Sequence, residues 1–508
     1  MGVPIDHEYR QLAAAGMNRH EAISVAFERG IAAGDIYPGS RLPTIRRLSA
    51  ELGVSGATVA AAYRLLHKRG WTRGEVGRGT FVIGEQAEAL DHSPVRRPPA
   101  LYEAAPTASP RAPWRRRALL ASAARLRAMY PTALDCTSGK PDPSLFLTEI
   151  FLRSWRAAID QTDMRDLQYA SPEPVRALAD ALQHRFERDS ISAGGSGVVI
   201  GSSAQQLMVL SLSIAPALAG PGTRIVAVEE PGYQTVFDAF EHIGFRLVGM
   251  AVDGEGVQPN ALESALAQGA QAVLFTPRAQ NPYGGSWTAA RRMKLARVLA
   301  AYPGVVAIED DQFADLAHER PGSLLNDFRV AERVVYIRSF AKAVAPDIRI
   351  AAAVAQPRLL NLLAEAKSFT DGWSPQLSQR ALARLLSDPM LDDALNQARA
   401  LYDRRRSAAR AILIERLAPS GVVVQGEDGL NLWVQLRPGT DAGDVIERAG
   451  ALGVLCSPGE PFFIRPGRND VLRMSISGVD EAGAVAAAER LAEAVCSTTR
   501  GHARTIPI

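Results

Sequence analysis

The chain has 508 residues, more than one hydrophobic core accommodates at roughly 100 to 200 residues per domain, and this predicts at least two or three domains. Its formal net charge of +3 hides a basic stretch, because residues 41–80 carry eight Lys or Arg against two Glu. Three cysteines without paired spacing exclude a disulfide framework and a zinc site. No basic leader followed by an apolar run opens the chain, and no apolar run has membrane-spanning length. We therefore expect a cytoplasmic protein without a metal site.

Residues 18–84 alternate helical patterns with short turns. Thr44 is suited to cap a helix, Gly53 marks a tight turn, and Ser55 is suited to cap the next helix. The glycines of residues 77–82 favour a hairpin that approaches phosphates closely. We predict a helix-turn-helix followed by a wing.

These pieces, in this order, resemble the winged-helix GntR family of DNA-binding proteins. The resemblance implies that the second helix enters the major groove of double-stranded DNA by its amino-terminal end. Gly56 departs from the family, which usually has an arginine directly after the capping residue, and this puts strong binding in doubt. A winged helix kept for protein interaction is the alternative. The residues we expect at DNA are Arg41, Arg46, Arg47, Ser55, Thr58, Tyr63, Arg78, Gly79 and Thr80.

Residues 85–130 are rich in proline, alanine and arginine, a composition typical of a linker. A helical pattern resumes over 114–129. From residue 131 to 496, short apolar runs alternate with amphipathic stretches, which predicts a mainly parallel sheet covered by helices on both faces. We expect a large α/β subdomain over about 160–385 and a smaller α+β subdomain over about 386–496. The apolar runs include 197–200, 224–228, 272–275 and 305–308.

Several polar residues follow these runs, where parallel strands present a common edge. Ser203, Ala204 and Gln205 open a helix after a strand, and backbone amides at such a position bind phosphate. Tyr233 could lie flat on an aromatic cofactor, and Asn281 could donate to a phenolate oxygen. Each residue taken alone is also an ordinary turn or cap residue.

Lys342 suggests that these residues bind the same cofactor. A lysine amine can hold an aldehyde cofactor covalently, while Arg349, seven residues on, binds its phosphate. Asp310, at the end of a predicted strand, could keep a pyridine nitrogen protonated. The order of the five signals favours pyridoxal 5'-phosphate.

The same order resembles the fold type I aminotransferases over residues 134–496. Their fusion to a GntR-like winged helix resembles the MocR/GabR group of transcriptional regulators, which implies a homodimer. By this resemblance Lys342 forms a Schiff base with pyridoxal 5'-phosphate, Asp310 pairs with the ring nitrogen, and Arg473 binds the carboxylate of an effector or substrate. The remaining cofactor contacts implied are Tyr233 on the ring, Asn281 at the phenolate, and Ser203, Ala204, Gln205, Ser339 and Arg349 around the phosphate.

Three departures put efficient transamination in doubt. Gln312 and Phe313 stand where the family commonly has a tyrosine, and Ala341 replaces a common hydroxyl residue before the lysine. Ala204 likewise replaces a hydroxyl at the phosphate turn. Covalent attachment should survive these losses.

We therefore expect a multidomain regulator: an α+β winged helix-turn-helix followed by an α/β fold type I domain with a small α+β carboxyl-terminal subdomain. Its small-molecule partner is an amine or amino acid, or pyridoxal 5'-phosphate itself. A working aminotransferase with an accessory winged helix is the alternative function, and a scaffold with an inactive site is a third. The sequence leaves the effector, the operator and the sign of regulation open.

Overall fold

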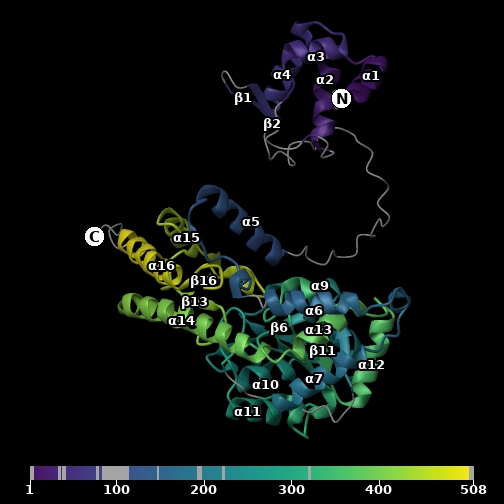
Figure 1. Cartoon of the computed structure of the whole chain (residues 1–508). Coiled ribbons are helices and arrows are strands. Elements are labelled where there is room, and N and C mark those ends of the chain that lie inside the picture. The colour runs from purple at the N-terminus through teal and green to yellow at the C-terminus, as the bar shows by residue number, and fades with distance from the viewer. Residues whose placement is uncertain are drawn as a thin grey trace. The chain divides into compact units, whose positions relative to one another are not determined.

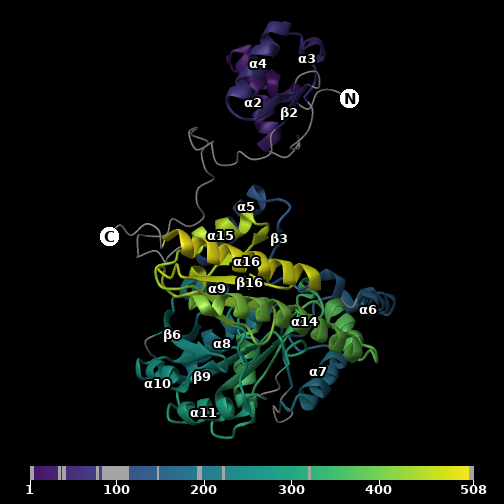
Figure 2. The same ribbon diagram turned by 90° about the vertical axis from the view of Figure 1, so that its left-hand side faces the viewer.

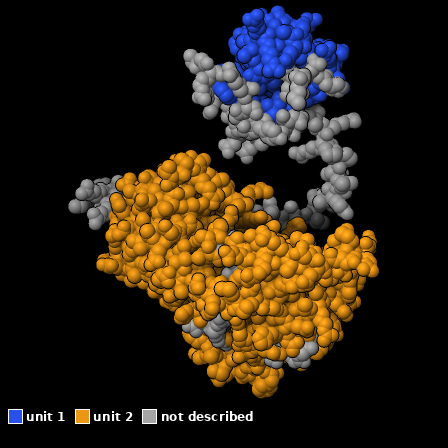
Figure 3. Space-filling view, in the orientation of Figure 1, with its two compact units in different colours: residues 1–107 blue, residues 108–508 orange. Residues whose placement is uncertain are grey.

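The computed structural model describes residues 5–32, 36, 42–75, 79–82, 114–145, 148–191, 197–219, 224–318 and 322–502. The chain divides into two compact units, residues 1–107 and residues 108–508 (Figures 1 and 3). No helix within these described ranges is long and apolar enough to cross a membrane.

Unit 1 is a winged helix-turn-helix, which confirms the predicted fold. Its core includes Ile23, Phe27 and Leu66, and also Ile5 and Tyr9, which lie before the predicted boundary at residue 18. The elements are α1 (Asp6–Ala14), α2 (Arg19–Ala32), α3 (Ile45–Leu52), α4 (Gly56–Lys68) and the antiparallel pair β1 (Thr72–Glu75) and β2 (Gly79–Val82).

The turn between α3 and α4 forms as the sequence predicts. The Thr44 side chain accepts a hydrogen bond from the Arg47 amide at 3.3 Å, and the Ser55 side chain accepts one from the Thr58 amide at 3.1 Å. Gly53 ends α3 in the left-handed region, with φ of 66°, where a Cβ is disfavoured. Two caps and one glycine therefore fix the direction of α4.

Unit 2 is built on an eight-stranded, mainly parallel sheet in the order β4-β11-β10-β9-β8-β5-β6-β7. The pairs β5/β6, β5/β8, β8/β9 and β9/β10 are parallel, whereas β11 runs antiparallel to both β10 and β4. The strands are β4 (Val199–Gly201), β5 (Ile225–Glu230), β6 (Arg246–Asp253), β7 (Gly256–Val257), β8 (Ala272–Phe275), β9 (Val306–Asp311), β10 (Val334–Ser339) and β11 (Ala351–Val354).

Alternate residues of the central strands enter two separate cores, so both faces of the sheet are covered. Val226 and Ile308 pack with α8 and α12, whereas Ala227 and Ala307 pack in the core that contains α7, α10 and α11. The covering helices are α6 (Thr148–Asp160), α7 (Arg176–Arg188), α8 (Ala204–Ala219), α9 (Gln234–His242), α10 (Pro259–Ala267), α11 (Ala289–Ala300), α12 (Pro357–Ser368) and α13 (Gln376–Leu386).

A smaller antiparallel sheet at the carboxyl end has the order β12-β13-β16-β15, which confirms the predicted α+β subdomain. Helices α14 and α16 run side by side next to it (Figure 2). The elements are β12 (Val423–Gln425), β13 (Asn431–Gln435), β15 (Ser457–Pro458), β16 (Val471–Ser475), α14 (Leu391–Leu417), α15 (Ala442–Ala451) and α16 (Glu481–His502). Short 3-10 helices are η1 (Pro143–Leu145), η2 (Met164–Leu167), η3 (Leu324–Asn326), η4 (Ala331–Arg333), η5 (Pro346–Ile348), η6 (Ala418–Ser420) and η7 (Glu460–Phe462).

Helix α5 (Trp114–Met129) belongs to unit 2, although the sequence places it in the linker over 85–130. It packs on α9, η7 and α15, and its Arg115, Ala123 and Leu126 are buried. The linker residues 83–113 lie outside the described part of the chain.

The first strand of unit 2 is also shared with the carboxyl-terminal part. Strand β3 (Leu134–Asp135) pairs in parallel with β14 (Val454–Leu455). The next residue of each segment is a buried free thiol, Cys136 and Cys456, whereas the third cysteine, Cys496, lies partly exposed on α16.

Candidate functional site

The carboxyl ends of the parallel strands place the predicted cofactor residues at one edge of the large sheet. Tyr233 follows β5 as the amino-terminal cap of α9, and Asn281 follows β8. Lys342 lies in the turn after β10. Parallel strands that end at a common edge form the usual ligand site of such sheets.

A cavity of about 200 Å³ at this edge is lined by Lys342, Tyr233, Asn281 and Arg473 together. The sequence predicts all four of these residues for the site, from segments that are up to 240 residues apart. The other lining residues are Ser138, Gly139, Lys140, Gln234, Thr276, Ala279, Gln312, Phe313, Leu430 and Asn431. None of the described lining residues carries a carboxylate, so the cavity suits an anionic ligand.

The Lys342 amine is hydrogen-bonded to the backbone, and its pKa is lowered. Its Nζ donates to the Gly139 carbonyl at 2.6 Å. Burial lowers the pKa of Lys342 to about 8, and the charge of Arg473 lowers it in the same direction, while Asp310 raises it. A lysine with such a pKa is partly neutral near pH 7.5, and the neutral amine is the nucleophile.

Asp310 lies within β9 rather than at its end, because the strand extends to Asp311. Its Oδ2 accepts a hydrogen bond from Gln312 Nε2 at 2.6 Å, whereas its Oδ1 is buried without a hydrogen-bond partner in the described residues. Burial raises the pKa of Asp310 to about 7, and the neighbouring Asp311 acts in the same direction. An unpaired buried carboxylate oxygen is costly, so Oδ1 is suited to a donor supplied by a ligand.

Arg473 lies on β16 with its side chain buried. Its Nη2 donates to the Thr137 carbonyl at 2.7 Å, its Nη1 donates to Asn281 Oδ1 at 3.4 Å, and the guanidinium lies 4.7 Å from the centroid of the Phe462 ring. In the described part of the chain it has no ion-pair partner. Burial lowers the pKa of Arg473 to about 10. A buried cation without an acidic neighbour is suited to bind a carboxylate.

The predicted phosphate residues lie at the same edge but do not line this cavity. Ala351 pairs with both Gly201 and Ser339, so the turn before α8 and the end of β10 are neighbours. The Ser203 side chain accepts a hydrogen bond from the Gln206 amide at 3.1 Å, and α8 begins at Ala204. Gln205 and Arg349 differ in exposure: Gln205 is half-buried, and Arg349 is exposed, with φ of 51°.

Three of the predicted DNA residues are exposed in unit 1, and the others that the structure describes are half-buried or buried. Arg46, Arg47 and Ser55 are exposed, although Arg47 Nε pairs with Glu51 at 2.9 Å. Thr58, Gly79 and Thr80 are half-buried, and the last two open β2, whose Thr80 carbonyl accepts from the Leu42 amide. Arg41 and Arg78 lie outside the described residues.

Tyr63 lies differently from the other described residues that we expect at DNA. Its side chain is buried, its hydroxyl donates to the Pro43 carbonyl at 2.6 Å, and its ring meets Phe27 edge to face at 5.9 Å. Burial raises the pKa of Tyr63. The structure assigns Tyr63 to the core of unit 1, because its hydroxyl is already bonded within the fold.

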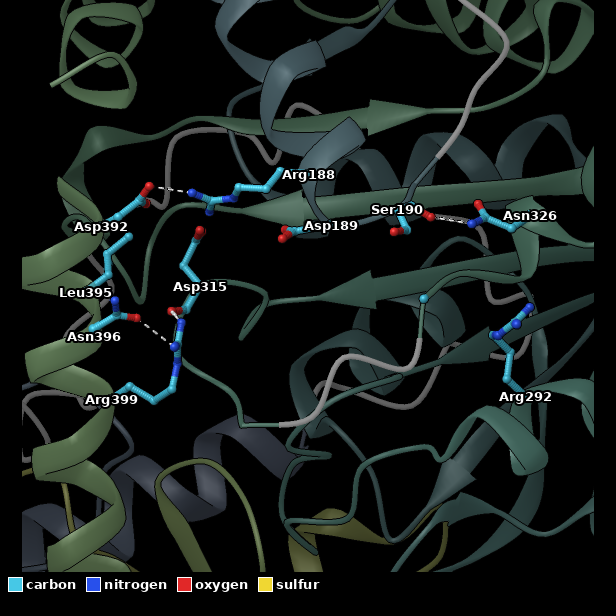
Figure 4. A pocket seen from close by; sticks show the side chains of 11 residues that line it. Arg188, Asp189, Ser190, Arg292, Asp315, Asn326, Asp392, Leu395, Asn396 and Arg399 are labelled. Carbon is cyan, nitrogen blue, oxygen red and sulfur yellow. Dashed lines mark hydrogen bonds and ion pairs between the residues drawn. The ribbon is translucent and has the colours of Figure 1, made fainter. Parts of the chain in front are cut away.

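A second cavity, of about 630 Å³, is larger, but charged side chains that pair with one another line it (Figure 4). Arg188 pairs with Asp392, and Arg399 donates to the Asp315 carbonyl at 2.8 Å. The charges of Arg338 and Arg185 hold the pKa of Asp315 at about 2. Because these charges neutralise one another, we place the functional site at the cavity around Lys342.

Two families match the chain over separate segments. Residues 144–491 match "Aminotransferase class I and II", and residues 20–82 match "Bacterial regulatory proteins, gntR family". The "Vitamin B6 salvage pathway transcriptional repressor PtsJ" of Salmonella typhimurium is 30% identical over 80% of this chain and 83% of PtsJ. The chain belongs to the MocR-type transcriptional regulators.

Other relatives of this MocR-type regulator include regulators and enzymes. The "HTH-type transcriptional regulator TauR" of Rhodobacter capsulatus is 27% identical over 97% of this chain and all of TauR. The crystal structure of the α-aminoadipate aminotransferase LysN of Thermus thermophilus, complexed with N-(5'-phosphopyridoxyl)-L-leucine, is 27% identical with a TM-score of 0.64. It covers 76% of this chain and 97% of LysN. Unit 2 therefore has a fold type I aminotransferase domain, and its family typically binds pyridoxal 5'-phosphate.

Sequence reasoning missed two polar groups of this MocR-type site. The Gly139 carbonyl accepts a hydrogen bond from the Lys342 amine, and Asn431 Nδ2 donates to Asn281 Oδ1 at 3.3 Å. Gly139 follows β3 and Asn431 begins β13, and both are far in sequence from the large-sheet strand ends that carry Tyr233, Asn281 and Lys342. Their local sequence holds no cofactor signal, because they reach the site only through the packing of the small subdomain.

Proposed function

We propose that this MocR-type regulator holds pyridoxal 5'-phosphate on Lys342 and changes its binding to DNA when an amino compound enters the same site. The observation that carries the proposal is a buried acid whose charge acts on a partly buried amine: Asp310 Oδ1 lacks a hydrogen-bond partner in the described residues, and Lys342 lines the cavity with a pKa of about 8. A protonated ring nitrogen would satisfy Oδ1, and an aldehyde would react with the amine. The residues therefore fit this cofactor.

When bound, the cofactor would supply an aldehyde carbon and an electron-withdrawing ring. Asp310 would hold a proton on the ring nitrogen, because a carboxylate beside a pyridine nitrogen favours the charged form of that nitrogen. Tyr233 and Asn281, both at the cavity, would contact the ring and its phenolate oxygen. Ser203, Ala204, Gln205, Ser339 and Arg349 would surround the phosphate.

The effector we propose is an amine that carries a carboxylate. Arg473 is buried at the cavity, and its guanidinium has no acidic partner in the described residues. Its hydrogen bonds to Thr137 and Asn281 leave donors for a bidentate contact. The effector amine would then compete with the Lys342 amine for the aldehyde of the cofactor.

A second candidate is a sensor of pyridoxal 5'-phosphate itself, without an amine effector. The likeness to PtsJ, named as a repressor of vitamin B6 salvage, favours it. Arg473→Ala separates the two: it abolishes regulation by an amino acid, whereas a sensor of the cofactor alone keeps its response.

We also propose that DNA is bound by a homodimer. Large apolar side chains are exposed on unit 2, namely Met164, Leu167, Tyr169 and Phe369, and Tyr169 contacts Trp373 edge to face at 5.5 Å. Exposed apolar side chains of this size support an association surface. Paired or directly repeated half-sites in DNA would follow.

The test is the binding of the cofactor-loaded protein to its own upstream intergenic DNA, compared with scrambled DNA at near-physiological salt. Lys342→Ala is measured alongside. Specific binding that the variant alters supports the proposal. Binding no tighter than to scrambled DNA, together with steady conversion of an amino acid and 2-oxoglutarate, makes the protein an aminotransferase instead.

A further inference from the structure

Arg115, the second residue of α5, is only 1% exposed and ties that helix to two other segments. Its Nη1 donates to Asp238 Oδ1 and to Glu241 Oε2 on α9, each at 2.8 Å. It also donates to the carbonyls of Phe463 at 3.0 Å and Ile464 at 2.5 Å. Charge-assisted hydrogen bonds are stronger than neutral ones, so the first turn of α5 is firmly held.

Both segments that Arg115 holds also carry residues of the cofactor cavity. Helix α9 begins directly after Tyr233. Phe462, next to Phe463 in the chain, lies against the Arg473 guanidinium at 4.7 Å. The Gly232 amide donates to the Phe462 carbonyl at 2.9 Å, so the two segments are also bonded to each other. A shift of Tyr233 would therefore reach Arg115 along the first turns of α9, and a shift of Arg473 would reach it through Phe462 and the adjacent Phe463.

The contacts of Arg115 bear on the DNA-binding unit because of the position of α5 in the chain. It is the first described element after residues 83–113, which join unit 1 to unit 2. The amide of Arg116 donates to Asp238 Oδ2 at 3.1 Å, a second bond between this turn and α9. Any force carried along the chain between the units acts on the first turn of α5.

We propose that Arg115 is a positioning residue that couples occupancy of the Lys342 cavity to the segment leading to the DNA-binding unit. The inference rests on the proposed function, since it needs a ligand in that cavity. An arginine with a purely structural role would hold α5 equally well with and without the ligand. A coupling arginine makes the stability of the first turn of α5 depend on occupancy.

The experiment is hydrogen exchange on the full-length protein, with pyridoxal 5'-phosphate as the probe, followed at peptides that include the Arg116 amide. Absorbance of the same samples reports whether the probe binds. In the wild-type protein, loading should change exchange at this turn by about threefold or more. In Arg115→Gln, the probe should still bind while exchange at the turn no longer responds.

The same samples are then tested on DNA. Loading should change the Kd for DNA about fivefold or more in the wild-type protein. In Arg115→Gln the ratio of the loaded and unloaded Kd values should approach one. Arg125→Gln is the matched control, because Arg125 lies on the same helix and its ion pair with Glu447 is half exposed on both sides. It should behave as the wild-type protein does.

A milder variant keeps the test decisive if Arg115→Gln fails to fold. Glu241→Gln removes the charge of one partner of Arg115, at a side chain that is 22% exposed, and the ion pair with Asp238 stays. It should reduce the response at α5 without removing it. A wild-type protein that binds the probe with unchanged exchange at this turn overturns the inference and leaves the proposed function standing. A wild-type protein that does not bind the probe at all overturns both.

Discussion

The acidity of Lys342 should depend on Arg473, and this dependence can be measured through the capture of pyridoxal 5'-phosphate. Burial is the main cause that lowers the pKa of Lys342 to about 8, and Arg473 is the second. Replacing Arg473 by glutamine removes the second cause and leaves the first. We expect the pKa of Lys342 to rise in Arg473→Gln, without reaching the ordinary value of 10.5.

The size of the effect follows from the fraction of neutral amine. At pH 7.5 a lysine with a pKa of about 8 is neutral in about a quarter of the molecules, whereas one at 10.5 is neutral in about one in a thousand. The cavity therefore raises the concentration of the nucleophile by roughly two orders of magnitude. Part of this gain should be lost in Arg473→Gln, so capture at pH 7.5 slows while capture near pH 10.5 changes little.

Stopped-flow absorbance after mixing the cofactor-free protein with pyridoxal 5'-phosphate, between pH 6 and 10.5, measures the midpoint of the rate. The wild-type midpoint should lie near pH 8, and the midpoint of Arg473→Gln should lie higher. Arg437→Gln, an exposed arginine just after β13, is the control and should leave the midpoint unchanged. A midpoint for Arg473→Gln at or below that of the wild-type protein would refute the reasoning.

Four further outcomes are expected. Asp310→Asn removes the charge that raises the pKa of Lys342, so the midpoint in the same stopped-flow assay should move to lower pH; an upward shift would contradict the assignment. Arg46→Gln should weaken DNA binding about equally on all sequences and reduce the slope of log K against log salt by roughly 0.9, and an unchanged slope would exclude a phosphate contact. Ser55→Ala removes the cap of α4 and should cost about 1 kcal/mol, seen as faster hydrogen exchange in α4 of the full-length chain. Arg338→Met removes the cation that Asp189 and Asp315 share, although Asp315 keeps its pair with Arg185, and should destabilise unit 2 by about 3 to 5 kcal/mol in urea, whereas a loss below about 1 kcal/mol would mean that water reaches this network.

The sequence predicted those parts of the fold in which local chemistry decides the structure. Thr44, Gly53 and Ser55 carry the turn of the winged helix because caps and a left-handed glycine act within a few residues. The sequence also predicted that the residues after the strands lie close together. Continuous apolar runs form parallel strands, and parallel strands end at one edge of the sheet. Lys342 and Arg473 therefore line one cavity, as their order in the chain suggests.

Long-range packing decided what the sequence did not predict. Helix α1 was missed because Ile5 and Tyr9 are its main core residues in an otherwise polar stretch. Tyr63 was assigned to DNA from its place in the second helix, but the Pro43 carbonyl, twenty residues away, binds its hydroxyl. Arg115, which the sequence places in the linker, pairs with acidic residues on α9, and no short-range sequence pattern predicts such a contact.

The three cysteines allow the distance between the two units to be measured with and without a ligand. Burial raises the pKa of Cys136 and, to about 12, that of Cys456, so both remain unreactive thiols at neutral pH. Cys496 on α16 is partly exposed, and residues 1–107 contain no cysteine. A maleimide dye should therefore label the unmodified protein at Cys496. One cysteine introduced on α4 would then complete a fluorescence pair that reports the distance between the units with and without a ligand, and every native cysteine would be kept.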